Sequence, residues 1–596
     1  MIVFFVLHIL TVLVNSEVPE LEIPQGTLRG QYLESVSARK FSSFTAIPYA
    51  EPPIGVLRFK APQPAGPWHG ILDASKSHPI CPQINVFVGD DTIRGDEDCL
   101  YLNVYTPQTT YPADKLLPVM IFLHGGGYLA GDGSRSSYDP SILMDKDIVL
   151  VIPNYRLGLL GFLSTGDEIS PGNYGLKDQN LAIKWVKDNI KHFGGDPDSI
   201  TLFGQSAGGS SAHFHMLSPL SKHLINRVIC ESGTAFSRWA LAPNDQGTRY
   251  ARKLARHFNC SVQTSFEMIE CLRRVDAYEL TKRQDLFYEW SFHPMMPFKP
   301  VIEPNIEGAF LSEHPMDTVK NGRAGNVTFM TGITTDEGAF VSPSLYNTPG
   351  LLEDFNEHFE KKAPLTMLYN EVAPDKNYVT KRIRKFYFGE KAIDNTTRSE
   401  VTNMLTDGNY LLAANEAVRL HLRYTHQPVY FYVFGYRGSV SFSSIFGDPL
   451  NDYGTCHVDE LIYLFLLPNV FPQYELNHNE RNMAEIMTTL WTNFAVTGDP
   501  TPTTDALIPE KWEPIKTDNL EFYFIMNDTN LEMSERYNWE RAQFWDDLPL
   551  STRKSFFNYY CKSKPWGKKY DGSVALHACN FYTELETLTP LSLEAA

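Results

Sequence analysis

The chain has 596 residues, of which 43% are apolar and 20% are charged. This composition is typical of a globular protein with an ample core. The formal net charge of −18, from 52 basic and 70 acidic residues, argues against nucleic acid and anionic membrane surfaces as partners.

The first residues are typical of a targeting segment. Residues 2–14 are almost wholly apolar, too few to span a bilayer comfortably, and lead into a small-residue cleavage site at Asn15-Ser16. We therefore predict a signal peptide over residues 1–16, in preference to a membrane anchor, and a secreted protein. No later apolar stretch approaches the ~20 residues of a transmembrane helix, and the C-terminus lacks the hydrophobic tail of a lipid-anchor signal.

The cysteines suit an oxidising compartment. Three pairs are predicted as disulfide cysteines: Cys81 and Cys99, which bracket a polar loop, Cys260 and Cys271, which bracket a short amphipathic segment, and Cys561 and Cys579 near the C-terminus. Whether the last two pair within one chain or between chains stays open. Cys230 and Cys456 are predicted free thiols. Since no cysteine pair has metal-ligand spacing near a histidine pair, we expect no metal and no cofactor.

Four Asn-x-Ser/Thr sequons are candidate glycosylation sites in a secreted chain. They begin at Asn259, Asn326, Asn395 and Asn527. Asn259 is the least suitable of the four, because its middle residue, Cys260, is a predicted half-cystine.

Apolar runs alternate with helical patterns along the chain. The runs at 117–123, 148–152, 200–203, 227–230, 326–330 and 429–433 suit strands that are buried on both faces. Leu181, Trp185, Val186, Ile190 and Phe193 share one helical face, and Gly194-Gly195 ends that helix. We predict an α/β protein with a mixed, mostly parallel sheet flanked by helices over residues 17–550. Residues 551–596, rich in lysine and aromatic residues, form a C-terminal extension.

Two glycine-rich motifs follow predicted strands. His124-Gly125-Gly126-Gly127 follows the run at 117–123, the context of an oxyanion-hole loop in α/β-hydrolases. Gly204-Gln205-Ser206-Ala207-Gly208 follows the run at 200–203 and predicts a strand-to-helix elbow that exposes the Ser206 hydroxyl. The N–H groups of Gly126, Gly127 and Ala207 would bind an oxyanion.

A serine nucleophile needs a base and an acid. His457 lies in the glycine-rich loop 454–460, and Asp336 and Glu337 follow the predicted strand that ends at Met330. The order Ser206, Glu337, His457 is that of α/β-hydrolases. The composition of the loop does not separate Asp336 from Glu337 as the acid.

The chain resembles the type-B carboxylesterase/cholinesterase family from about residue 20 to residue 550. The segments that carry the resemblance are 47–53, 97–104, 124–127, 154–158, 172–179, 204–209, 335–338, 454–457, 491–495 and 497–500. The resemblance implies an α/β-hydrolase fold and a serine carboxylic-ester hydrolase that works through an acyl-enzyme. It places the acid at Glu337 and the base at His457.

The same resemblance implies roles for further residues. Ser232 would support Glu337, and Trp239 would wall the acyl pocket. Arg58 with Glu97 and Arg156 with Asp178 would form buried ion pairs, retained more for fold specificity than for net stability.

Departures from the cholinesterases narrow the expected substrate. Cholinesterases carry a tryptophan in the first disulfide loop, which stacks on a quaternary ammonium, and a glutamate before the nucleophile. This chain has Phe87 but no tryptophan in the loop 82–98, and the neutral Gln205 before Ser206. We therefore predict a small neutral ester as substrate. The family's third disulfide partner is replaced by Ala542.

The elbow and the His457 loop are most similar to those of insect secreted esterases. That group includes general carboxylesterases, and also juvenile hormone esterases and odorant- or pheromone-degrading esterases as more specific alternatives. A non-catalytic adhesion protein on the same fold is the rival from another class. Such relatives usually lack the serine or histidine, whereas this chain has Ser206, Glu337 and His457.

Overall fold

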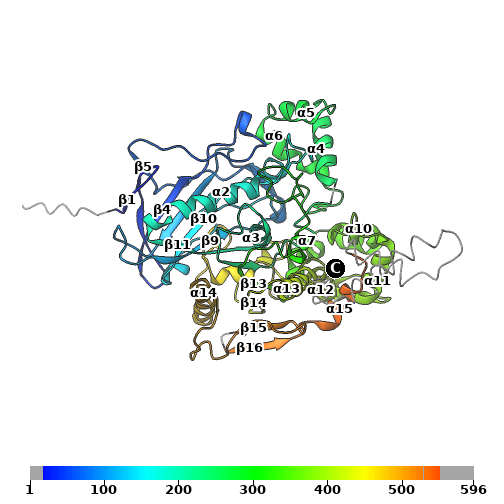
Figure 1. Cartoon of the computed structure of the whole chain (residues 1–596). Helices are drawn as coiled ribbons and strands as arrows, with labels where there is room; N and C mark the ends of the chain where they lie inside the picture. Colours follow the sequence, from blue (N-terminus) through cyan, green and yellow to red (C-terminus); the bar gives the residue numbers. More distant parts are fainter. Residues whose placement is uncertain (1–17, 244, 528, 551–596) are drawn as a thin grey trace, which may run out of the picture.

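The computed structural model describes residues 18–243, 245–527 and 529–550, and one twisted sheet runs through the molecule (Figure 1). Among these residues the sheet has eleven strands. Their spatial order is β16 (Asn530–Glu535), β15 (Glu521–Asn527), β14 (Val429–Phe434), β13 (Thr328–Thr334), β12 (Arg227–Glu231), β11 (Gly195–Gln205), β9 (Leu117–Leu123), β10 (Val149–Pro153), β8 (Tyr101–Thr106), β4 (Lys40–Pro48) and β3 (Gln31–Glu34).

The centre of this sheet is parallel and its two edges are antiparallel. Neighbouring strands from β10 across to β15 run parallel. The pairs at both edges run antiparallel. Every residue of β10 and β14 is buried, because helices cover both faces of the parallel centre. The predicted mixed, mostly parallel α/β architecture is confirmed.

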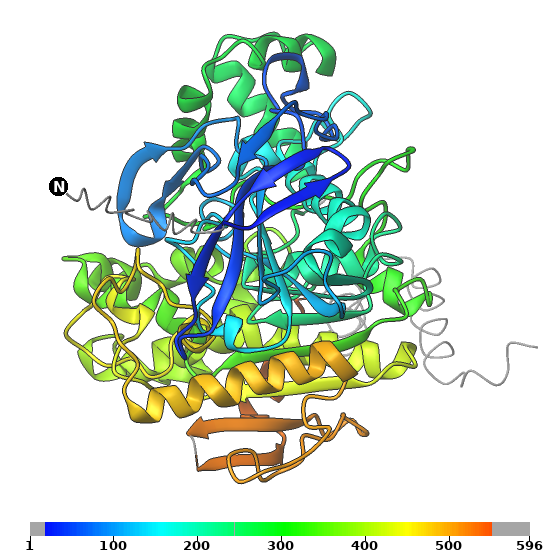
Figure 2. The ribbon, with the colours of Figure 1, turned by 90° about the vertical axis from the view of Figure 1, so that its left-hand side faces the viewer.

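Helices pack on both faces of the sheet. α2 (Tyr174–Asn189) and α3 (Ala207–Leu217) lie on one face, and α14 (His478–Thr497) lies against β9 and β11 from the other (Figures 1 and 2). α2 continues as a short 3-10 turn to Phe193, where Gly194 adopts φ 81° and ends it. The predicted helix and its glycine stop are therefore present.

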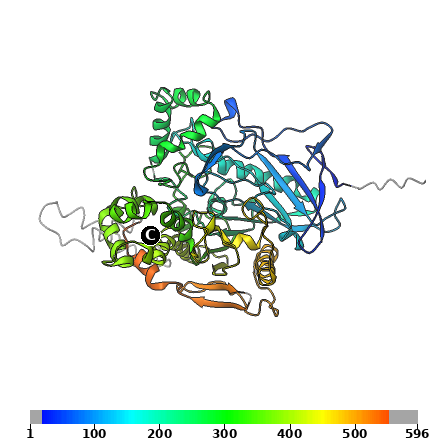
Figure 3. The same ribbon diagram turned by 180° about the vertical axis from the view of Figure 1, so that it is seen from behind.

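The remaining helices form two groups. α4 (Gln246–His257), α5 (Ser265–Leu272) and α6 (Ala277–Lys282) project to one side (Figure 1). A second group gathers beyond the carboxyl ends of the parallel strands, opposite the β1–β4 end of the molecule (Figure 3). It contains α8 (Ser342–Asn347), α9 (Leu351–Glu357), α10 (Phe359–Thr366), α11 (Lys376–Phe388), α12 (Arg398–Thr406), α13 (Leu412–Tyr424) and α15 (Trp539–Asp546).

Short elements complete the chain. They are the strands β1 (Glu20–Ile23), β2 (Gly26–Arg29) and β5 (Ile71–Asp73), which form a small sheet, the hairpin of β6 (Gln83–Asn85) and β7 (Asp90–Arg94), and the helices α1 (Gly158–Phe162) and α7 (Pro315–Lys320).

Two strands extend well beyond their predicted runs. β11 spans Gly195–Gln205, where the predicted run was 200–203. β13, predicted to end at Met330, extends to Thr334 and pairs with β14 from Phe329 onward. A Cβ on Gly332 would lie 2.2 Å from the Tyr432 ring. The glycine makes room for this ring inside the strand rather than forming a turn.

Candidate active site

Ser206 lies at a sharp turn between β11 and α3. Its backbone has φ 57° and ψ −118°, a conformation that non-glycine residues seldom adopt. The Ser206 N–H donates to the Glu231 carbonyl at 2.7 Å. A Cβ on Gly208 would lie 1.8 Å from the Leu123 carbonyl oxygen. A glycine is therefore needed for α3 to turn back so close to β9, and the turn has the form expected of a nucleophile elbow.

The glycine loop after β9 lies beside this elbow. Gly126 and Gly127 have φ of 96° and 62°. A Cβ on Gly126 would lie 1.9 Å from the Ala130 carbonyl oxygen, and one on Gly127 would lie 2.8 Å from the Phe87 ring. Within the described part of the chain, the N–H groups of Gly126, Gly127 and Ala207 donate to no other residue. They are therefore available to an anionic oxygen.

His457 contacts Glu337 across the carboxyl ends of the parallel strands. The His457 Nδ1 lies 2.5 Å from the Glu337 Oε2, and both side chains are buried. The second carboxylate oxygen of Glu337 accepts the Thr334 N–H at 2.9 Å. Glu337 therefore fixes the orientation of the imidazole. Because a carboxylate can only accept a hydrogen bond, the proton of the neutral imidazole must lie on Nδ1.

Asp336, the other candidate acid, has other hydrogen-bond partners. Its carboxylate accepts the Thr335 hydroxyl at 2.7 Å and the Thr455 N–H at 3.1 Å. Burial raises its pKa. Asp336 thus ties the loop of His457 to the end of β13, and Glu337 is the carboxylate that contacts the imidazole.

The predicted contact of Ser232 with Glu337 is wrong. The Ser232 hydroxyl donates to Glu460 Oε1 at 3.2 Å. Glu460 lies in the short turn Asp459–Tyr463 that follows His457, and its side chain is buried.

Further buried carboxyls lie behind Glu337. Burial raises the pKa of Glu231 to about 8 and that of Asp459 to about 7. Burial, together with the charges of Glu337 and Glu231, raises the pKa of Glu460 well above its usual range. The Trp491 Nε1 donates to Glu231 at 2.5 Å. Since its pKa is about 8, Glu231 is mostly protonated at neutral pH, and this limits the negative charge near the Glu337–His457 pair.

Aromatic side chains surround His457. Tyr410 and Phe340 have ring centroids 4.7 and 5.3 Å from the imidazole. Phe340 in turn contacts Phe87 at 5.1 Å. The predicted pocket residue Trp239 is buried, contacts Tyr410 at 6.1 Å, and donates its Nε1 to the Asn409 carbonyl at 3.0 Å.

Sequence reasoning missed Phe340 and Tyr410. Phe340 lies three residues after Glu337 in the same short helical turn, so that both side chains lie in one region. This spacing could have identified Phe340 from the sequence. Tyr410 lies in an irregular helical segment between α12 and α13 and has no nearby motif that could have identified it.

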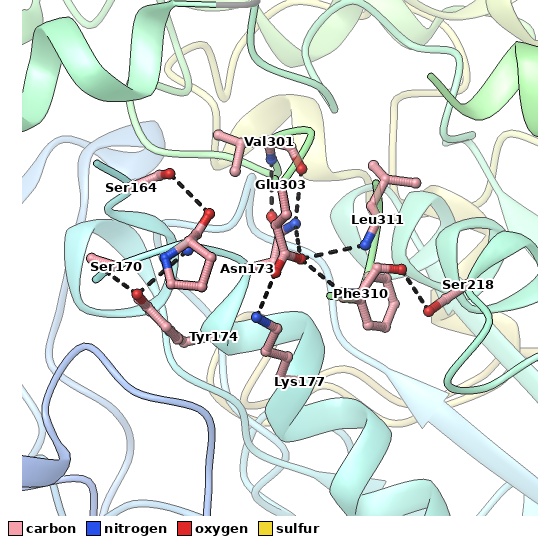
Figure 4. A network of polar contacts seen from close by, with 12 residues as sticks. Ser164, Ser170, Asn173, Tyr174, Lys177, Ser218, Val301, Glu303, Phe310 and Leu311 are labelled. Carbon is pink, nitrogen blue, oxygen red and sulfur yellow. Dashed lines mark hydrogen bonds and ion pairs between the residues drawn. The ribbon is translucent and has the colours of Figure 1, made fainter. Parts of the chain in front are cut away.

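Buried ion pairs hold the surrounding elements. Arg156 binds Asp178 at 2.6 Å, and Arg58 binds Glu97 at 2.5 Å, as the sequence resemblance implied. A third pair, Lys177 with Glu303 at 2.6 Å, was not predicted. Figure 4 shows that Glu303 also accepts hydrogen bonds from Asn173, Phe310 and Leu311. This network fixes the start of α2 to the segment 301–311.

The structure joins Cys81 to Cys99 and Cys260 to Cys271. Cys230 and Cys456 are buried free thiols. Cys561 and Cys579 lie outside the described residues, as does the predicted signal peptide. Among the sequons, Asn259, Asn326 and Asn395 are exposed and Asn527 is half-buried.

The described ranges contain no group of three or more histidine, cysteine, aspartate or glutamate residues arranged to hold a metal ion. No helix within them is both long and apolar enough to cross a bilayer.

The chain is similar to known proteins along most of its length. The chain matches the model of the carboxylesterase family over residues 17–545. It is 35% identical to the juvenile hormone esterase of Tribolium castaneum, with 90% of this chain and 93% of that protein aligned. It is 34% identical to venom carboxylesterase-6 of Apis mellifera, with 91% and 96% aligned.

A solved structure is also similar. It is the crystal structure of juvenile hormone esterase from Manduca sexta with OTFP covalently attached. The TM-score is 0.78 at 30% sequence identity, and the match covers 89% of this chain and 99% of that chain. The sheet topology, the family match and these relatives together show that the chain belongs to the carboxylesterase family and is a carboxylic-ester hydrolase with the α/β-hydrolase fold.

Proposed function

We propose that Ser206, His457 and Glu337 are the catalytic triad of this hydrolase and that it cleaves neutral carboxylic esters through an acyl-enzyme. The observation that carries the proposal is the 2.5 Å contact between His457 Nδ1 and Glu337 Oε2 at the same sheet edge as the strained Ser206 elbow. The covalent OTFP on the Manduca sexta relative supports covalent chemistry in the family.

In the acylation step, the Ser206 Oγ attacks the ester carbonyl carbon while His457 Nε2 takes the hydroxyl proton. The carbonyl oxygen becomes an oxyanion, which the N–H groups of Gly126, Gly127 and Ala207 stabilise. The C–O bond to the alcohol then breaks, and His457 returns the proton to the leaving oxygen. Water attacks the acyl-enzyme by the same route and releases the acid and Ser206. Glu337 stays ionised and stabilises the imidazolium.

The substrate class follows from the groups beside the triad. Gln205 carries no charge, the loop 82–98 holds Phe87 but no tryptophan, and Phe340 and Tyr410 add further aromatic surface. Trp239 would wall the acyl side. These surfaces favour an apolar, uncharged ester over a choline ester.

Substitution of the nucleophile tests the proposal. Ser206→Ala should lower kcat/KM on a neutral aryl ester by about 10⁴-fold or more, because no other group forms the acyl-enzyme. Mass spectrometry after incubation with OTFP should find the adduct on the Ser206 peptide of the wild-type protein and none in the variant. Full turnover by a purified, folded Ser206→Ala protein would disprove the triad.

We also infer that residues 1–16 are a signal peptide, that residues 17–550 form the hydrolase domain, and that the protein is secreted. The exposed Asn326 and Asn395 would carry glycans. N-terminal sequencing of the protein from the culture medium should begin at Glu17, and glycosidase treatment should lower its mass. An N-terminus at Met1 on the secreted protein would contradict the inferred cleavage.

A further inference from the structure

The residue before the nucleophile touches the proposed base. Gln205 is the last residue of β11, and its side chain is 2% exposed. Its Nε2 lies 3.3 Å from the Nε2 of His457. In the same structure, the Ser206 hydroxyl makes no hydrogen bond to any described residue. The imidazole nitrogen that should take the serine proton is therefore occupied by a different side chain.

The direction of this hydrogen bond follows from the other side of the ring. His457 Nδ1 lies 2.5 Å from the Glu337 carboxylate, which can only accept, so the Nδ1 carries the proton. In the neutral imidazole the Nε2 is then an acceptor. The carboxamide N–H of Gln205 must donate to it, because the carboxamide oxygen would place two acceptors against each other.

We propose that Gln205 is a positioning residue that donates to the Nε2 of His457 in the substrate-free enzyme and stabilises the neutral imidazole over the imidazolium. The proposal rests on the proposed function. Before acylation, Ser206 must replace Gln205 at the Nε2 lone pair, so that the hydroxyl proton can move to that nitrogen. The Gln205 N–H cannot face a protonated Nε2 favourably, so protonation requires the carboxamide to rotate and present its oxygen. A carboxylate at the same place would accept from the imidazolium in either orientation and attract it by its charge.

Other titratable groups near His457 come from several elements. They are Glu337, Asp336, Tyr410, Cys456, Asp459, Glu460 and Glu231. Burial raises the pKa of the Tyr410 hydroxyl and of the Cys456 thiol far enough to keep both uncharged at neutral pH. None of these groups has a hydrogen bond to Nε2 among the described residues. A substitution of Gln205 is thus the direct way to place a different charge next to the His457 Nε2.

The neighbouring backbone leaves room for a side chain of this size. A Cβ on Gly125 would lie 2.8 Å from the Gln205 Oε1. Glycine at this position therefore accommodates the carboxamide between the oxyanion loop and His457. Glutamate has the same shape and fits the same space, so that Gln205→Glu changes charge and donor capacity with little change in packing.

The test is the pH dependence of kcat/KM on a neutral aryl ester, for the wild-type protein, Gln205→Glu and Gln205→Met. We expect Gln205→Glu to move the midpoint of the acidic limb upward by about one pH unit or more. Gln205→Met, which removes the donor without adding charge, should move it upward by less. Gln63→Glu adds the same charge at an exposed position and should leave the midpoint of the acidic limb unchanged.

Two outcomes would overturn the proposal. One is a wild-type acidic limb for Gln205→Glu. The other is an equal loss of plateau activity in both Gln205 variants with no movement of the limb, which would show a purely structural role. If the Gln205→Glu protein turns over too slowly, NMR titration of the His457 imidazole in the substrate-free protein gives the same midpoint.

Ser206→Ala separates this proposal from the proposed function. An active Ser206→Ala protein would refute the proposed function itself. An inactive Ser206→Ala protein, together with an unmoved limb in Gln205→Glu, would refute the role of Gln205 alone.

Discussion

Glu337 and Asp336 are neighbours in the sequence, but their side chains meet different partners. Glu337 contacts the imidazole of His457, whereas Asp336 accepts from Thr335 and Thr455. We expect Glu337→Gln to lower kcat by about 10⁴-fold, because an amide in place of the carboxylate no longer holds the proton on Nδ1. Steady-state kinetics on a neutral aryl ester measure the loss.

Asp336→Asn is the matched control for that substitution. An amide oxygen can still accept from the Thr335 hydroxyl and the Thr455 N–H, so we expect kcat to stay within about tenfold of wild type. Equal losses in the two variants would argue against Glu337 as the distinct partner of His457.

The raised pKa of Glu231 makes stability depend on pH. The pKa is about 8 in the folded protein and 4.5 in its ordinary state. Between these values the folded protein binds more protons than the unfolded chain, so the free energy of unfolding falls as the pH rises. Glu231→Gln keeps an acceptor for Trp491 and removes the ionisation. Relative to wild type, the variant should gain on the order of 1 kcal/mol per pH unit across this window.

Unfolding by urea at pH 5, 7 and 9 measures this difference. We expect near-equal stability at pH 5 and a growing advantage of Glu231→Gln at pH 7 and 9. Glu34→Gln, at an exposed position, serves as the control and should show no such trend. A difference that shrinks as the pH rises would contradict the sign of the shift.

At the scale of elements, the Lys177–Glu303 pair joins α2 to the segment 301–311 (Figure 4). Lys177→Met should cost about 3–5 kcal/mol of unfolding free energy, because it leaves the Glu303 charge buried without its cation. Adding Glu303→Gln to Lys177→Met should recover part of the loss, since the amide still accepts from neighbouring N–H groups. Urea unfolding of the single and double variants tests this.

Lys187 gives a control on the same helix. It pairs with Asp198 at the surface, where the Asp198 side chain is 85% exposed. Lys187→Met should change the unfolding free energy by about 1 kcal/mol or less. Similar losses at Lys177 and Lys187 would show that burial of the Glu303 pair is not what matters.

The sequence predicted the central strands well, because runs such as 429–433 are continuous, apolar and buried on both faces. It predicted the two glycine motifs because tight turns require small residues. Composition did not separate Glu337 from Asp336, and only the family resemblance favoured Glu337. The sequence did not predict which hydrogen-bond partner a buried side chain has when several lie close together. Ser232 reaches Glu460 instead of Glu337, and Gln205 reaches His457, because these contacts depend on rotamers in a packed interior.

At the scale of the whole molecule, side-chain contacts hold the last described helix, α15, against the rest of the protein. α15 packs through buried Trp545, whose Nε1 donates to Tyr387 at 2.7 Å, and Arg541 binds Asp407 at 2.6 Å. Ala542, at the position of the family's third disulfide partner, is buried in this helix. These contacts hold α15 in place without a covalent link.

We therefore expect a chain that ends at Leu550 to be secreted and to keep the kcat/KM of the full protein. A chain that ends at Glu535 lacks α15 and leaves the buried Asp407 without its arginine, so its yield and Tm should fall. Secretion yield, thermal unfolding and ester hydrolysis compare the three proteins. Loss of activity in the chain that ends at Leu550 would assign a role to the extension.

Phe87 has a broader consequence. It lies in the loop closed by the Cys81–Cys99 disulfide, and its ring lies beside Gly127 of the glycine loop. Tyr410 comes from the segment between α12 and α13, whereas Phe340 shares a short turn with Glu337. Phe87 and Tyr410 are thus encoded in stretches of chain that hold none of the three residues of the proposed triad. Changes in these two segments can produce hydrolases with new ester preferences, while the elbow, Glu337 and His457 stay the same.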